Sequence, residues 1–147
     1  MGGHPWFYFV DYEPDITAAL QKLRQREFIA GRYNPVVWFP EFPIGLHSPS
    51  PGAQHDSIEE ALEDSGEDGT RSILDMMQVS ATPDYFTVAP IPIDDLRRQF
   101  GTDRPTHEMI ENSDEIFETL ERGKGIYIVV YKEDKPTEIY FAGYSFD

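Results

Sequence analysis

The run EDSGEDGTRSILD, residues 63–75, combines acids, hydroxyl side chains and glycines in one short stretch. Counted from Asp64, it follows in part the spacing of a calcium-binding loop, which needs oxygen ligands at its first, fifth and last positions and a glycine at its sixth. Asp64, Asp68, Gly69 and Asp75 stand at these positions. A divalent-metal loop at residues 64–75 is therefore one hypothesis for this stretch.

Three departures from the loop pattern weaken the calcium hypothesis. Gly66 offers no side-chain oxygen at the third position, Arg71 places a positive charge beside the site, and Asp75 is shorter than the usual final Glu. A phosphate site is an alternative, because glycine N–H groups near the start of a helix can bind an anion. The acids on both sides would repel that anion, so the phosphate hypothesis is weaker still.

A third interpretation, which we favour, treats this run as a junction between two helices. Gly66 would end the first helix in a left-handed conformation, and Thr70 would begin the second. The only lysine or arginine between Arg32 and Arg97 is Arg71, which would then form ion pairs with the surrounding acids. The second helix would turn three apolar side chains inward: Ile73, Met76 and Met77.

The run HEMIE places His107 and Glu111 four residues apart, on one face of a helix, as in half of a zinc-protease motif. The second histidine of that motif is missing, and the sequence offers no third ligand. A solvated acidic face is the favoured interpretation. His4, His47 and His55 have no ligand spacing, and the chain contains no recognised nucleophile motif. We therefore expect no cofactor and favour a non-catalytic protein over an enzyme.

Aromatic side chains suggest a second kind of site. A pocket between the proline-rich segment and the sheet could be lined by Trp38, Arg71 and Tyr131, and could serve a small enzyme or a ligand-binding domain. The tyrosine-rich face of the C-terminal hairpin could instead form a recognition surface. The favoured alternative is that these rings are half-buried core residues with their hydroxyl groups at the edge.

The negative charge of the chain is unevenly placed. The net charge is −15, and the first 55 residues, with five acids and four bases, contribute only −1 of it. A surface of this kind repels phosphate groups and anionic lipids, so we expect neither nucleic-acid nor membrane binding. It favours solubility and, where there is a partner, a basic protein.

Length and cysteine content constrain the class of protein. A chain of 147 residues with 39% hydrophobic residues is expected to fold as a single globular domain. The chain lacks cysteine, and its first residues do not follow the pattern of a signal peptide, so a cytoplasmic location is expected.

Local patterns predict the order of the elements. We expect a strand at 6–12 near the centre of a sheet, a helix from Asp15 to Gly31, and a short strand at 36–39. A proline-rich loop, mobile or simply irregular, should cover about 40–55. Three more helices should follow: from Asp56 or Ser57 to about 64, at 94–100, and from Asn112 to about 121. A further strand is expected at 85–89.

The C-terminal run GIYIVVYKEDKPTEIYFAG predicts a hairpin with strands at 126–131 and 138–143. A turn centred on residues 134–135 would place Ile128, Val130, Ile139 and Phe141 on one face. Both faces are apolar, so helices should cover most of the sheet. These elements indicate an α+β fold with a mixed or antiparallel sheet. The favoured function is an acidic protein-binding module, such as an inhibitor, an immunity-type protein or an adaptor.

Overall fold

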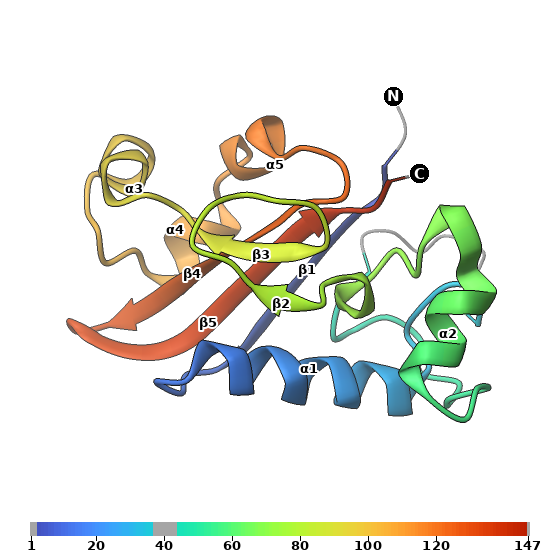
Figure 1. Cartoon of the computed structure of the whole chain (residues 1–147). Helices are drawn as coiled ribbons and strands as arrows, with labels where there is room; N and C mark the ends of the chain where they lie inside the picture. Colours follow the sequence, from blue (N-terminus) through green and yellow to red (C-terminus); the bar gives the residue numbers. More distant parts are fainter. Residues whose placement is uncertain (1–2, 37–43, 147) are drawn as a thin grey trace.

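A five-stranded mixed sheet forms the centre of the computed structural model, which describes residues 3–36 and 44–146 (Figure 1). The strand order is β1-β5-β4-β3-β2, with antiparallel pairing from β1 to β4 and parallel pairing from β4 to β2. This arrangement confirms the predicted α+β class and the C-terminal hairpin. The strands are β1 Pro5–Asp11, β2 Gln78–Val79, β3 Thr87–Pro90, β4 Gly125–Lys132 and β5 Lys135–Tyr144.

Helical segments cover both faces of the sheet, as the apolar strands predict. On one face α1, Ile16–Ala30, and the short helix η2, Ile73–Asp75, pack on Trp6, Tyr8 and Phe141. On the other face α3, α4 and α5 enclose a second core around Ile128, Val130 and Tyr140. The remaining helical bounds are α2 Ile58–Ser65, η1 Gly66–Asp68, α3 Ile93–Phe100, α4 His107–Glu111 and α5 Glu115–Thr119.

Most helix ends lie where their capping residues predict. Asp15 accepts a hydrogen bond from the Ala18 N–H at the start of α1, and Gly31 ends that helix in the left-handed region. The Ser57 hydroxyl caps α2 in the same way. A helix lies within the predicted range 112–121, but its predicted start is wrong. Asn112 ends α4 by donating its N–H to the Glu108 carbonyl, and α5 starts only at Glu115.

The position predicted for the first strand is also wrong. β1 lies at the edge of the sheet and not near its centre. Two of its rings, Trp6 and Tyr8, are buried all the same because they lie in the core beneath α1, whereas Phe7 and Phe9 are partly buried on the other face. Across the edge, the Phe7 N–H donates to the Ile44 carbonyl. The strand predicted at 36–39 falls outside the described residues apart from Val36, which lies in a turn.

The predicted division of the hairpin faces is wrong for a physical reason. The two-residue turn at Glu133 and Asp134 is followed by a β-bulge, since Tyr131 pairs with Pro136 whereas Val130 pairs with Glu138. Thr137 is the extra residue. Because side chains alternate between the two faces of a strand, one extra residue moves every later side chain of β5 to the opposite face. Ile128 and Val130 therefore share a face with Tyr140 and Ala142, whereas Ile139 and Phe141 face α1.

The described part of the proline-rich loop, residues 44–55, is an irregular connection fastened to two helices. The N–H groups of Gly52 and Ala53 donate to carbonyls at the end of α1, at 2.8 and 3.1 Å. The Tyr33 hydroxyl lies 2.7 Å from His55 Nδ1, and His55 Nε2 lies 2.9 Å from the Asp64 carboxylate. Burial raises the pKa of the Tyr33 hydroxyl, so this group stays protonated and can donate a hydrogen bond to His55.

Candidate functional site

The acidic run at 63–75 is a helix junction. Gly66 follows α2 with a φ of 60°, and Gly69 ends η1 with a φ of 73°. The segment that follows begins at Ser72 and not at Thr70, because the Ser72 hydroxyl accepts a hydrogen bond from the Leu74 N–H. Two of the three side chains predicted to face inward, Ile73 and Met76, are fully buried, and Met77 is exposed.

Asp75 organises this junction from inside. Its carboxylate accepts hydrogen bonds from the Thr70 N–H at 2.7 Å, from the Thr70 hydroxyl at 2.8 Å and from the Arg71 N–H. Burial raises the pKa of Asp75, and these hydrogen bonds oppose the rise. A Cβ on Gly69 would lie 2.8 Å from the same carboxylate, so glycine is required there. The loop thus folds around the carboxylate of Asp75, which belongs to the same run of residues.

The two acids that would begin and end a calcium loop contact different groups. Asp64 pairs with His55, whereas Asp75 faces the backbone of the junction. Within residues 3–36 and 44–146, no three His, Cys, Asp or Glu side chains are grouped so that they could hold a metal ion. This geometry favours the junction over the metal loop.

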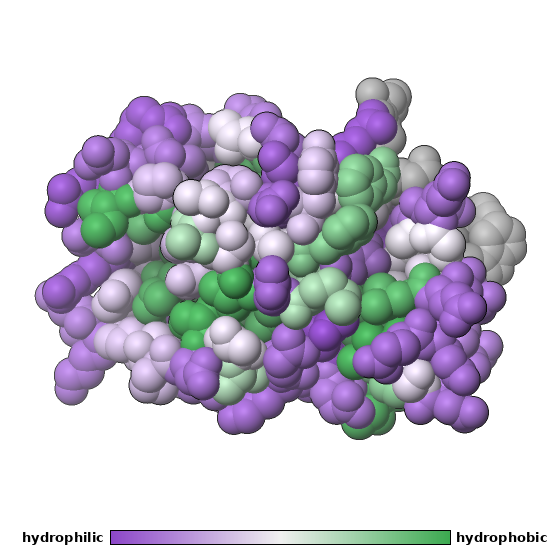
Figure 2. Space-filling view, in the orientation of Figure 1, coloured by the Kyte–Doolittle hydropathy of each residue, from purple (hydrophilic) through white to green (hydrophobic). Residues whose placement is uncertain are grey.

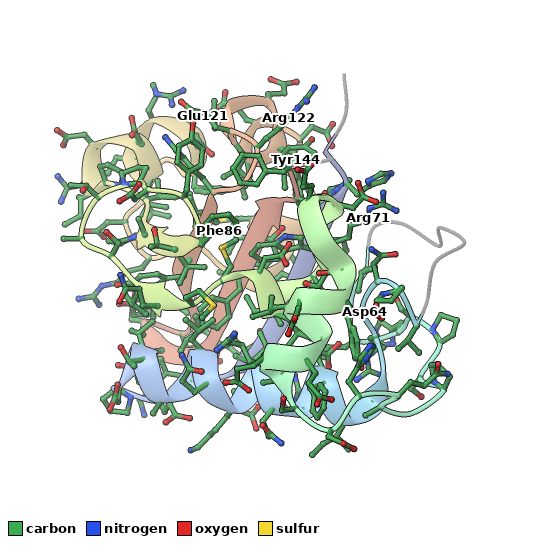
Figure 3. The ribbon with its side chains drawn as sticks, turned by 45° about the vertical axis from the view of Figure 1, so that its right-hand side comes forward. Asp64, Arg71, Phe86, Glu121, Arg122 and Tyr144 are labelled. Carbon is green, nitrogen blue, oxygen red and sulfur yellow. The ribbon has the colours of Figure 1, made fainter. Side chains whose placement is uncertain are left out.

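The three residues predicted to line one pocket do not come together among the described residues. Arg71, with a φ of 54°, lies in the junction on the side of the molecule shown in Figure 3. Tyr131 lies near the turn of the hairpin, where the Arg104 guanidinium is 5.6 Å from its ring and its N–H donates to Pro105. Trp38 is outside the described residues. Ligand binding by these residues stays a prediction.

His107 has both ring nitrogens engaged by carboxylates. Nε2 lies 3.1 Å from Glu111, as the HEMIE spacing predicts, and Nδ1 lies 2.8 Å from Glu138 of β5. The ring stacks on Phe9 with centroids 3.8 Å apart. The two carboxylates lie on opposite sides of the imidazole and cannot bind one ion together with it. The geometry ties α4 to the edge of the sheet.

Four large apolar side chains gather on the surface around the loop between β2 and β3. We call this set the aromatic wall; the side chains are between 38% and 51% exposed. The Phe146 ring centroid lies 5.3 Å from that of Tyr85 and 5.4 Å from that of Phe86. Figure 2 shows hydrophobic side chains gathered across the middle of this face, within a hydrophilic rim. The aromatic wall consists of Met77, Tyr85, Phe86 and Phe146.

Phe86 is held in a backbone conformation that disfavours a bulky side chain. Its φ is 60°, in the left-handed region. Two hydrogen bonds fix it there: its N–H donates to the Gly123 carbonyl at 2.8 Å, and its carbonyl accepts from the Met77 N–H at 2.7 Å. The backbone thus fixes the place from which the half-exposed ring projects, next to the loop that carries Glu121 and Arg122 (Figure 3).

Gly123 also shapes the aromatic wall. The Phe146 ring lies directly against its Cα, so that a Cβ there would be 2.5 Å from the ring. The φ of Gly123 is 75°, which glycine adopts without strain. The wall therefore depends on two backbone features that together set the positions of Phe86 and Phe146.

A groove of about 310 Å³ separates the aromatic wall from α2 and η1. Leu62, Ser65 and Glu67 line the opposite side, with Gly66 and Gly69 between them. We call the segment that forms this side, residues 58–68, the acidic wall. It contains no lysine or arginine, and of its six acids Glu67 lines the groove. The other five lie elsewhere on α2 and η1: Glu59, Glu60, Glu63, Asp64 and Asp68. The groove thus has exposed aromatic rings on one side and, on the other, Glu67 within an acidic segment of the chain.

Sequence patterns did not identify this groove. The pattern at residues 85–89 predicts only a strand, and Phe146 lies in no periodic pattern. The one local signal is the run Asp84-Tyr85-Phe86, in which an acid is followed by two aromatic residues. The groove requires contacts between segments that are distant in sequence.

Comparison of the chain with protein-family models, with curated proteins and with solved structures gave no match. Among the described residues, the helices are all too short or too polar to cross a lipid bilayer.

Proposed function

We propose that this protein is a non-catalytic binding module whose groove receives a basic segment of another protein. The observation that supports this most strongly is Phe86, a half-exposed aromatic ring held at positive φ beside other exposed rings. Backbone strain of this kind costs on the order of 1–3 kcal/mol and is typically kept where it serves function.

The chemistry of the groove defines the partner. Exposed aromatic residues and methionine are typical of the centre of a protein interface, where a large apolar side chain of the partner provides most of the affinity. The acidic wall would attract lysine or arginine next to that apolar side chain. A segment with alternating basic and large apolar residues meets both requirements.

Binding of this type acts by steric and electrostatic complementarity. An inhibitor, an immunity-type protein or an adaptor works in this way and needs no nucleophile, metal ion or cofactor. The charge of −15 adds a long-range attraction that raises the association rate with a basic partner and decreases as salt screens it.

Fluorescence anisotropy with labelled peptides tests the proposal. The probe is Lys-Arg-Trp-Leu-Lys-Arg, and the controls are the same peptide with Glu for each base and with Ala for Trp and Leu. We expect only the first to bind, and its affinity to fall at least about tenfold between about 0.05 M and about 0.5 M salt.

Matched variants locate the binding surface. Phe86→Ser removes the central ring of the aromatic wall, and Ile93→Ser removes a similarly exposed apolar side chain from α3 on the other face of the sheet. We expect Phe86→Ser to weaken binding of the basic peptide at least about tenfold, and Ile93→Ser to leave it unchanged. Equal losses in both variants, or equal binding of the acidic peptide, would contradict the proposal.

A further inference from the structure

The outer edge of β1 is open over part of its length. β1 forms one edge of the sheet, opposite β2, and its inner side pairs with β5 (Figure 1). On its outer side, the Phe7 N–H donates to the Ile44 carbonyl. From Phe9 to Asp11, no residue of the described part of the chain pairs with this outer side.

The hydrogen bonds around β1 show which main-chain groups point outward. The Tyr12 N–H donates to the Thr137 carbonyl of β5, whereas the Phe7 N–H points to the outer side. Since successive peptide groups of a strand point to opposite edges, the N–H and C=O groups of Phe9 and Asp11 also point outward. These groups are available for pairing with another strand.

The outward groups are complementary to one another about a twofold axis. When two copies of β1 lie antiparallel with Val10 opposite Val10, Phe9 of each copy lies opposite Asp11 of the other. Each of these pairs exchanges two main-chain hydrogen bonds, so every outward group of Phe9 and Asp11 is used. The register ends before Phe7, which is already paired with Ile44. Contact between identical surfaces about a twofold axis is the commonest arrangement of soluble oligomers.

The charge near this edge allows two copies to approach. The chain carries a net charge of −15, but the first 55 residues contribute only −1 of it. The register places Asp11 opposite an aromatic residue and not opposite another acid. On the outer face of β5, Glu138 beside Asp11 already contacts His107 at 2.8 Å. A cleft of about 340 Å³ between β1 and α1 is lined by two acids and two bases: Asp11, Glu13, Lys22 and Arg26.

We propose that two copies of this chain associate through the open edge of β1, so that their sheets become one continuous sheet. The half-exposed side chains of Phe9 and Val10 are covered further by this pairing. A contact of this length buries less than the roughly 1,200 Å² of a stable interface, so the dimer is reversible, with a dissociation constant on the order of 1 µM to 1 mM. The groove adjoins β2 at the opposite edge, so this inference does not depend on the function proposed for the groove.

Analytical ultracentrifugation between about 10 µM and about 1 mM protein tests the association. The average mass of the native protein should rise from 16.9 kDa toward twice that value. Asp11→Pro removes one outward N–H and no hydrogen bond of the single copy, so it should stay a folded monomer at all concentrations. Asp11→Asn keeps the N–H and should associate at least as tightly as the native protein. Circular dichroism reports whether each variant is folded.

Two cysteine variants test the register. The chain has no cysteine of its own, so a single introduced cysteine reports only its own contacts. Val10→Cys places two cysteines opposite each other with Cα atoms about 4.5 Å apart, close enough for a disulfide, and should cross-link two copies under mild oxidation. Val79→Cys is the matched control, because Val79 is also a partly buried valine that packs on the same core, but lies in β2 at the opposite edge. It should remain a monomer.

Three results would overturn the inference. One is a native protein that stays a monomer up to about 1 mM. Another is an Asp11→Pro variant that associates as tightly as the native protein. The third is a Val79→Cys variant that cross-links as readily as Val10→Cys. Should Asp11→Pro not fold, the two cysteine variants decide the matter.

Discussion

Two substitutions of Phe86 distinguish the effect of its strained backbone on stability from the effect of its ring contacts. Phe86→Ala and Phe86→Gly both remove the ring, but only glycine accepts a φ of 60° without strain. Elsewhere in a protein, glycine lowers stability relative to alanine by about 0.5–1 kcal/mol. At this position we expect the opposite, with Phe86→Gly more stable than Phe86→Ala.

The expected changes in the free energy of unfolding follow from the exposure of the Phe86 ring and from its backbone conformation. Phe86 is 46% exposed, so about half of the roughly 1.5–3 kcal/mol for full burial of such a side chain is lost in either variant, or about 1 kcal/mol. Relief of the left-handed strain returns about 1 kcal/mol in Phe86→Gly alone. The free energy of unfolding should thus fall by about 1 kcal/mol or more in Phe86→Ala and stay nearly unchanged in Phe86→Gly.

Urea denaturation followed by circular dichroism measures both variants. The comparison uses the denaturation midpoint at a constant m-value, so that changes in the unfolded state are recognised. Both variants should lose affinity for the basic peptide, although only one loses stability. If Phe86→Ala is as stable as Phe86→Gly or more so, the backbone at this position is not strained, and the main argument for the groove fails.

Three further predictions concern the junction, the loop and the aromatic wall. Because burial raises the pKa of Asp75 above its ordinary value of 3.8, the folded state holds this proton more tightly than the unfolded state. The free energy of unfolding should therefore decrease as the pH rises from 3.8 through the folded-state pKa, and Asp75→Asn should make this decrease smaller in urea titrations at several pH values. Tyr33→Phe removes the 2.7 Å contact with His55 and should cost about 1 kcal/mol, with faster hydrogen exchange at Gly52 and Ala53; unchanged exchange would show that this contact does not fasten the loop. Gly123→Ala should displace Phe146, lower stability by about 1–3 kcal/mol and weaken peptide binding, and full retention of binding would argue against a role for Phe146.

The sequence predicts the helices and strands that local chemistry determines. Asp15, Ser57, Gly31 and Gly101 mark helix ends where the structure has them, because a capping side chain or a left-handed glycine acts on its own neighbours. Asn112 shows the limit of this rule. Its side chain suits a helix start, but the preceding turn uses its N–H to end α4.

The hairpin shows why strand existence is easier to predict than strand register. Both strands lie where their β-branched and aromatic residues indicate, yet the extra residue at Thr137 exchanges the two faces of β5 relative to β4. The Tyr12 N–H, which donates to the Thr137 carbonyl at 3.1 Å, is part of that arrangement. A contact between residues this far apart in sequence has no local pattern.

The groove, like the register of the hairpin, depends on contacts between segments that are distant in sequence. Its acidic wall is one continuous stretch of sequence that overlaps the junction predicted at 63–75, whereas its aromatic wall joins Met77, the β2–β3 loop and Phe146. Phe86 reaches its position only because Met77 and Gly123 provide hydrogen bonds from either side. A bulky residue would not occupy a left-handed position in an isolated loop, so the strain is a product of the tertiary structure. A strained and exposed aromatic ring that the fold fixes beside an acidic helix supports the proposal that a partner contacts both.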